Sequence, residues 1–165
     1  MSQAKKASVH DVEIRLAALD DSETISKLIY QAFSPFEPEY TEGAFEYTTP
    51  KADSIRPRFG EGPIWIAERE GEAVGTVSGM PEGERFYIRS MAISPSAQRG
   101  GIGQRLLDEL EAYAREKGFE KLFLCTTFVL PGAKSLYERN GFYVLRETEP
   151  EEWFDMGGLE MEKKL

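Results

Sequence analysis

The sequence predicts a single α/β (α+β) domain, built on a mixed and mostly antiparallel sheet of about seven strands with helices on both faces. Two strand-like runs, Ile64–Glu68 and Ala73–Met80, flank Glu70-Gly71-Glu72. This pattern indicates an antiparallel hairpin and disfavours a doubly wound parallel sheet. A third run, Phe86–Ile93, leads through Pro95 and a glycine-rich turn into a long amphipathic segment, which is a strand, turn and helix in that order.

The elements before the hairpin follow from alternation and helical spacing. Residues 1–11 are polar and are expected to form a flexible tail, so the domain is expected over residues 12–165. Val12–Leu16 alternates as a strand does, and the apolar stripe from Ile25 to Phe33 predicts a helix that Pro35 ends. The aromatic and polar stretch Phe36–Phe59 is expected to hold one or two short helices.

The elements after residue 118 complete the sheet. Lys121–Thr126 is apolar enough for a strand buried on both faces, so Cys125 is predicted to be a buried structural thiol. A short helix is expected to open at Pro131. Phe142–Leu145 and Leu159–Lys163 are expected to be the last two strands.

The glycine-rich turn and the helix after it are suited to binding an anion. Glycines allow backbone N–H groups to approach a phosphate, and a helix N-terminus adds about half a positive charge. Gly118 stands where a left-handed helix cap is expected. The helix packs on the sheet through residues at helical spacing, namely Ile102, Leu106, Leu107, Leu110, Tyr113 and Ala114.

Composition and charge exclude several classes of protein. The 29 acidic and 20 basic side chains give a formal net charge of −9, which argues against nucleic-acid binding. That charge fits either a cationic amine substrate or plain solubility. No apolar run is long enough to cross a membrane, and no signal peptide is evident. One cysteine fits a reducing cytoplasm, and the lone histidine, His10, supports no metal site.

The glycine motif identifies the kind of anion site. Neither a Walker loop nor a dinucleotide fingerprint fits it. The pattern Q/R-x-x-G-x-G of Gln98, Gly101 and Gly103 resembles the coenzyme A pyrophosphate loop of the GCN5-related N-acetyltransferases (GNAT superfamily). The resemblance extends upstream over Arg89–Pro95 and downstream over the block from Ala133 to Phe142.

The resemblance implies a fold, a co-substrate and its contacts. In the family the fourth strand splays from the parallel strand next to it, and the pantetheine arm of acetyl-CoA pairs along it. Backbone N–H groups of Met91, Ala92 and Ile93 are then expected at the thioester oxygen. The resemblance also implies cofactor contacts from Gln98, Arg99, Gly100, Gly101, Ile102, Gly103, Gln104, Ala133 and Lys134.

Two residues are candidates for proton transfer. Tyr137 matches the family tyrosine, whose phenol can protonate the departing thiolate; an aromatic core residue is the alternative. The family glutamate near the start of the fourth strand is absent, because Tyr87 stands there. Glu84 is the nearby candidate base, with a role in a surface turn as the alternative.

The resemblance thus implies transfer of an acetyl group from acetyl-CoA to a primary amine of a small molecule or peptide by direct attack. A non-catalytic acyl-CoA-binding regulatory module and a protein N-terminal or lysine acetyltransferase are the alternatives. A groove open at both ends would favour a polypeptide substrate. A homodimer is a further expectation, to which the loop holding Trp153 and Phe154 could contribute.

Overall fold

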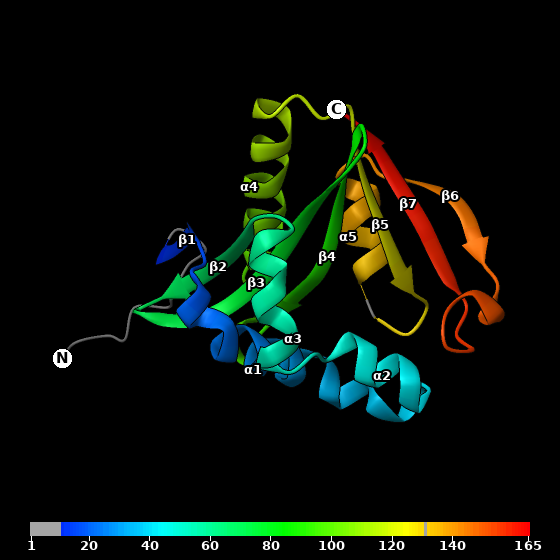
Figure 1. Ribbon diagram of the computed structural model, residues 1–165, viewed down its shortest axis with the longest axis horizontal. Coiled ribbons are helices and arrows are strands. Elements are labelled where there is room, and N and C mark those ends of the chain that lie inside the picture. Colours follow the sequence, from blue (N-terminus) through cyan, green and yellow to red (C-terminus); the bar gives the residue numbers. More distant parts are fainter. Residues whose placement is uncertain (1–10, 131) are drawn as a thin grey trace.

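The computed structural model describes residues 11–130 and 132–165, which fold around one seven-stranded sheet (Figure 1). The strand order is β1-β2-β3-β4-β5-β7-β6, and only β4 and β5 run parallel to each other. The mixed, mostly antiparallel sheet predicted from the sequence is therefore confirmed. The strands are β1 Val12–Leu16, β2 Ile64–Arg69, β3 Glu72–Glu82, β4 Arg85–Ile93, β5 Lys121–Thr127, β6 Tyr143–Thr148 and β7 Gly158–Lys164. The predictions for residues 1–10, His10 included, and for Pro131 lie outside the described residues.

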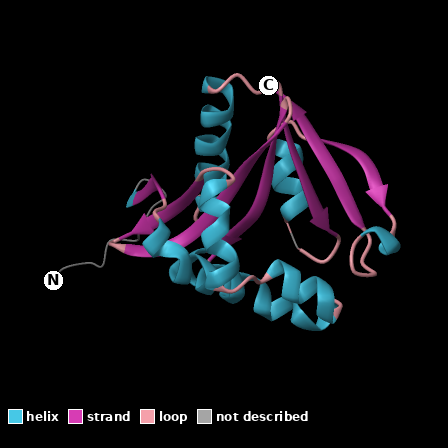
Figure 2. Ribbon diagram, viewed as in Figure 1, coloured by secondary structure: helices cyan, strands magenta, loops and turns pink. Residues whose placement is uncertain are grey.

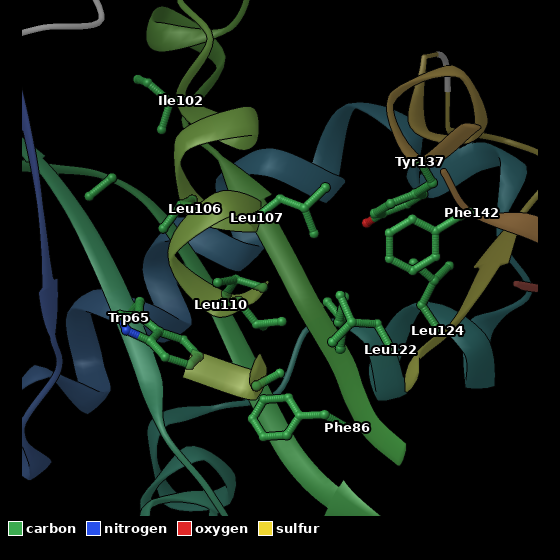
Figure 3. Packing of buried hydrophobic residues seen from close by; sticks show 14 of the residues in the cluster. Trp65, Phe86, Ile102, Leu106, Leu107, Leu110, Leu122, Leu124, Tyr137 and Phe142 are labelled. Atoms are coloured by element: carbon green, nitrogen blue, oxygen red, sulfur yellow. The ribbon is translucent and has the colours of Figure 1, made fainter. Parts of the chain in front are cut away.

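Helices cover both faces of the sheet, as predicted (Figure 2). On one face, α4 and α5 pack over a core that includes Phe86, Leu110 and Leu122 (Figure 3). On the other face, the first helices enclose a second core around Ile29 and Ile66. The α-helices are α1 Ser22–Phe33, α2 Glu42–Thr48, α3 Ala52–Ile55, α4 Ile102–Glu116 and α5 Ala133–Arg139, and short 3-10 segments span Leu19–Asp21, Ser34–Glu39, Arg56–Gly60, Pro95–Ala97 and Pro150–Glu152.

Left-handed glycines bound helix α4 at both ends. Gly101 is its N-cap at φ 75°, and Gly118 follows its C-terminus at φ 84°. The N–H of Phe119 bonds to the carbonyl of Ala114, and that of Gly118 bonds to Arg115, which is the Schellman cap. The helix therefore begins and ends where the glycines in the sequence predict.

Strand β3 is longer than the sequence suggests. The strand-like run predicted over Ala73–Met80 extends by two residues, because Pro81 and Glu82 pair with β4 and only Gly83 and Glu84 form the turn. Proline is tolerated there because the pairing of β3 with β2 ends at Ser78, so its missing N–H removes no bond from that side of the ladder.

A β-bulge divides strand β4. Thr76 of β3 faces Ala92 and Ser78 faces Arg89, so Ser90 and Met91 together oppose the single residue Val77. Ser90 takes a left-handed conformation at φ 56°. The extra residue reverses the alternation of β4, so that Phe86 and Ile88 before the bulge and Met91 and Ile93 after it all face the α4 core.

The parallel strands β4 and β5 separate beyond their first four pairs. Pairing between them runs from Arg85 with Lys121 to Ile88 with Leu124, and the residues of β4 and β5 beyond these do not pair with each other. Figure 1 shows the two strands beginning side by side and diverging along their length. The splay leaves the β5-facing backbone groups of β4 after Ile88 without a strand partner, next to the bulge.

Candidate active site

A cleft of about 950 Å³ follows the splay between β4 and β5. At one end lie the turn before α4 and helix α5. At the other end lie side chains of the 3-10 segment η4 (Arg56–Gly60), of α2 and of the β6–β7 loop, together with the central part of β4. We call the first end, formed by Ala97, Gln98, Arg99, Gly101, Ile102 and Gly103, the loop side. The second end, formed by Tyr47, Arg58, Tyr87, Arg89 and Trp153, is called the acceptor side.

Backbone conformation prepares the loop side for an anion. Arg99 and Gly101 both adopt positive φ, at 71° and 75°, so that the turn directs the chain into α4. Successive residues of alternating handedness and an N-terminal helix end concentrate N–H groups in one place. No acidic residue lies in the first turn of α4, and the 15-residue helix adds its dipole there. A phosphate-bearing ligand therefore fits this end of the cleft.

Most of the predicted cofactor-binding residues line this cleft. They are Met91, Ala92, Ile93, Gln98, Arg99, Gly101, Ile102, Gly103 and Ala133. Gly100, Gln104 and Lys134 are outside the lining. The Gln104 amide is bound to Asp108 and to Asn140, at 2.8 and 2.7 Å, and Lys134 lies 3.8 Å from the Glu138 carboxylate on the exposed face of α5. These two side chains hold helices together or face solvent, so the structure does not bring them to the cleft.

Tyr137 reaches the cleft from the core side. Its side chain is only 8% exposed and packs edge-on against Phe142, with the ring centroids 5.5 Å apart (Figure 3). No hydrogen bond to its hydroxyl occurs among the described residues, and burial raises the pKa of this phenol to about 12. Tyr137 is therefore part of the core, as the alternative interpretation expects, and it also lines the cleft. Its role as an acid stays a prediction.

Glu84 does not reach the cleft. It lies in the exposed β3–β4 turn, before the first residue of β4 that pairs with β5, and its backbone carbonyl accepts a bond from Glu120. The splay opens at the other end of β4. Tyr87 does line the cleft, and burial raises the pKa of its phenol to about 12. The structure thus supports the surface-turn interpretation of Glu84.

The acceptor side contains residues that sequence reasoning did not single out. Arg58 lies in η4 and donates from Nη1 to the Ser90 hydroxyl over 2.8 Å. Arg89 is the first residue of β4 after the last parallel pair and forms an ion pair with Glu61. Arg58 comes from a segment without readable periodicity, so only its charge could have marked it in the sequence.

Helix α2 and the β6–β7 loop meet beside the acceptor side. The ring of Tyr47 lies 5.9 Å from that of Trp153 and 5.4 Å from that of Phe154. The Thr41 hydroxyl donates to the carbonyl of Phe154 over 2.7 Å. The aromatic loop thus packs within its own chain. A homodimer that uses this loop stays a prediction, with Phe154 still 45% exposed.

The prediction that Cys125 is a buried structural thiol is wrong. Its residue is exposed and lines the cleft, because β5 loses its neighbour β4 after Leu124. The surrounding walls nevertheless desolvate the thiol and raise its pKa to about 11. At neutral pH Cys125 is therefore a protonated, weakly nucleophilic group.

The chain belongs to the acetyltransferase (GNAT) family, whose family model matches residues 26–142. Members of this family use acetyl-CoA as their co-substrate. Among solved structures, PaiA N-acetyltransferase from Thermoplasma acidophilum, in complex with coenzyme A, superposes with a TM-score of 0.79 at 20% identity, over 93% of this chain and 99% of that one. The ribosomal-protein-alanine N-acetyltransferase from Brucella melitensis gives a TM-score of 0.73 at 26% identity, over 93% and 99% of the two chains.

Curated relatives agree with the family and differ in length. The uncharacterized N-acetyltransferase YjgM from Escherichia coli (strain K12) is 27% identical over 135 residues, covering 78% of this chain and 80% of its own. The probable N-acetyltransferase camello from Xenopus tropicalis is 31% identical over 82 residues, covering 48% of this chain and 37% of its own. The match thus spans much less than two thirds of the Xenopus relative. None of the helices in the described residues is long and apolar enough to span a membrane.

Proposed function

We propose that the protein is an N-acetyltransferase that moves the acetyl group of acetyl-CoA to a primary amine of a small molecule or peptide. The observation that carries the proposal is one continuous cleft that joins the N-terminus of α4 to the unpaired edge of β4. The first feature suits a phosphate and the second suits an extended chain with amide groups. Acetyl-CoA contains both of these groups, because a pyrophosphate and a pantetheine arm with amide groups lie between its nucleoside and its thioester.

The chain's own residues have distinct roles in this proposal. The N–H groups of the turn from Gln98 to Gly103 hold the pyrophosphate, and the edge of β4 pairs with the pantetheine arm. When bound, acetyl-CoA supplies an acetyl group activated as a thioester. The backbone of Met91–Ile93, placed by the bulge, orients the thioester carbonyl and stabilises negative charge on its oxygen.

Tyr137 holds the proton that the leaving sulfur needs. A pKa of about 12 keeps the phenol protonated at neutral pH. Because a thiol has a lower pKa of about 8.5, the phenol assists the departing sulfur mainly by donating a hydrogen bond, and any proton that it gives up is replaced from solvent. Because no described side chain or backbone group bonds to its hydroxyl, that hydroxyl is free to donate to the departing sulfur. General-acid assistance of this kind contributes a factor of about 100 to 10,000 in rate.

Neither carboxylate of the cleft lining is well suited to act as the base. Glu152 and Glu160 are both bound to Arg146, at 2.7 and 3.0 Å. The bond from Arg146 lowers the pKa of Glu152 to about 2, which makes it a poor proton acceptor at neutral pH. The proposal therefore routes the proton of the amine to solvent in the cleft rather than to a side chain.

The proposal is tested by the release of free coenzyme A thiol from acetyl-CoA, measured against a panel of primary amines, with mass spectrometry of the product. We expect thiol release that depends on the amine and a gain of one acetyl group on that amine. Binding of acetyl-CoA without transfer to any amine would favour the regulatory module instead. The proposal places the protein in the cytoplasm, because its one cysteine leaves no internal disulfide to form.

A further inference from the structure

Two arginines meet at the bulge of β4, on the acceptor side of the cleft. Arg89 directly precedes Ser90, and the Arg58 guanidinium bonds to the Ser90 hydroxyl at 2.8 Å. Both arginines line the cleft, and both are only partly exposed. Ser90 is followed by Met91–Ile93, the segment that faces the thioester in the proposed function. The two positive charges therefore lie within a few residues of the reaction centre.

These two charges have too few anionic partners in the described part of the chain. Arg89 pairs with Glu61 through Nη2, while no described carboxylate lies within ion-pair distance of Arg58, whose bonded partner is a neutral hydroxyl. Burial and the neighbouring Arg89 lower the pKa of Arg58, which is the sign of a cation in an unfavourable place. In addition, Arg89 Nε is the one buried side-chain nitrogen or oxygen without a hydrogen-bond partner among the described residues.

The other arginines of the cleft lining leave no further unpaired positive charge on the acceptor side. Arg146 is neutralised by Glu152 and Glu160, whereas Arg99 lies on the loop side and Arg139 is the last residue of α5. A protein with a formal net charge of −9 thus keeps an uncompensated guanidinium beside the place where its substrate amine must come. The local charge at this wall is therefore positive, although the net charge of the chain is negative.

We propose that the acceptor is a small amine that also carries a carboxylate, and that Arg58 binds this carboxylate with Arg89 beside it. The inference rests on the proposed acetyl transfer and names its substrate class. A guanidinium presents parallel N–H donors that match a carboxylate. Polyamines are disfavoured because they would bring a second positive charge to Arg58.

The test compares standard L-amino acids with their own carboxamides as acceptors, in wild type, Arg58→Gln and Arg56→Gln. Arg56 is the matched control, because it lies two residues away and forms an ion pair with Asp53 at the exposed surface. The carboxamides keep the amine and the side chain and lose only the negative charge. Their amines are also less basic, so a preference for the acids arises against the intrinsic chemistry. Calorimetric binding of acetyl-CoA is measured in all three proteins.

We expect wild type and Arg56→Gln to prefer at least one acid over its amide by about tenfold to a hundredfold in kcat/KM, the range of one hydrogen bond to a charged group. In Arg58→Gln the preference is expected to fall to about twofold or less, with transfer to the amide and binding of acetyl-CoA retained. Transfer to amides as fast as to acids in wild type would overturn the inference and leave the acetyltransferase proposal standing. If wild type binds acetyl-CoA and acetylates none of the amino acids, the inference also fails.

Discussion

Replacement of Tyr137 by phenylalanine separates its chemical role from its structural one. The substitution keeps the ring, its contact with Phe142 at 5.5 Å and nearly all of the buried area. It removes a hydroxyl that bonds to no described group, so no hydrogen bond is lost. The hydroxyl is not among the buried side-chain atoms without a partner, so its removal relieves no large desolvation cost. The variant is therefore expected to be as stable as wild type to within about 0.5 kcal/mol, with a melting temperature changed by no more than about 2 °C.

The effect on catalysis is expected to be large, because the removed proton is the one that the leaving sulfur needs. We expect kcat to fall about 100- to 10,000-fold, which corresponds to about 3–6 kcal/mol at about 1.4 kcal/mol per tenfold change. The assay is thiol release under saturating acetyl-CoA, with thermal unfolding followed in parallel. A variant within threefold of wild type in kcat would refute the role of Tyr137 as an acid.

Tyr143 provides the matched control for this substitution. Its hydroxyl donates to Glu162 over 2.7 Å, and it lies on β6 outside the cleft lining. Tyr143→Phe is expected to lose about 1 kcal/mol of stability with unchanged transfer. The two variants thus reverse each other's effects: one loses rate at constant stability and the other loses stability at constant rate.

Three further predictions test the packing and the titration of the cleft. Gly79→Ala places a Cβ 2.1 Å from a ring carbon of Phe86, so chemical denaturation is expected to show a free energy of unfolding about 1–3 kcal/mol lower than in wild type. The control is Gly60→Ala, where the added atom meets open space, and its free energy of unfolding is expected to change by no more than about 1 kcal/mol. Iodoacetamide is expected to modify Cys125 slowly at pH 7.5, and the rate is expected to rise as the pH approaches the thiol pKa of about 11. Bound coenzyme A is expected to slow the modification further. A rate at pH 7.5 equal to that of glutathione would contradict the raised pKa. Unfolded tyrosines ionise near pH 10, whereas Tyr137 keeps its proton to about pH 12, so the free energy of unfolding is expected to fall as the pH rises from 10 to 12. Tyr137→Phe is expected to reduce the slope of that free energy against pH by at most about 1.4 kcal/mol per pH unit. Identical slopes in the two proteins would count against the buried phenol.

Local sequence signals predicted the parts of this protein that depend on neighbouring residues in the chain. The apolar stripe from Ile102 to Ala114 has one interpretation at helical spacing, and Gly101 and Gly118 mark its ends by conformations that other residues adopt at a cost. The two-residue turn Glu70-Gly71, with φ 53° and 77°, likewise follows from local chemistry. These elements, together with the family motif, located the loop side of the cleft.

The acceptor side depends on long-range geometry and escaped prediction for that reason. The bulge at Ser90 arises from a register shift against Val77 of β3, and the residue types in β4 do not predict it. Cys125 lies in an apolar run that suits a buried strand, but its exposure depends on where β4 and β5 part. Arg58 approaches Ser90 from a position 32 residues earlier, a contact that only the folded chain reveals.

The central claim is that the turn before α4 binds acetyl-CoA, and calorimetric titration of the wild type, Gly101→Trp and Gly118→Trp tests it most directly. Both glycines have positive φ at the ends of one helix, so tryptophan strains the backbone similarly in each, and only Gly101 lines the cleft. We predict micromolar-range binding by wild type and Gly118→Trp and none by folded Gly101→Trp. Equal binding by the two variants, or no binding by wild type with its fold intact, would contradict the account.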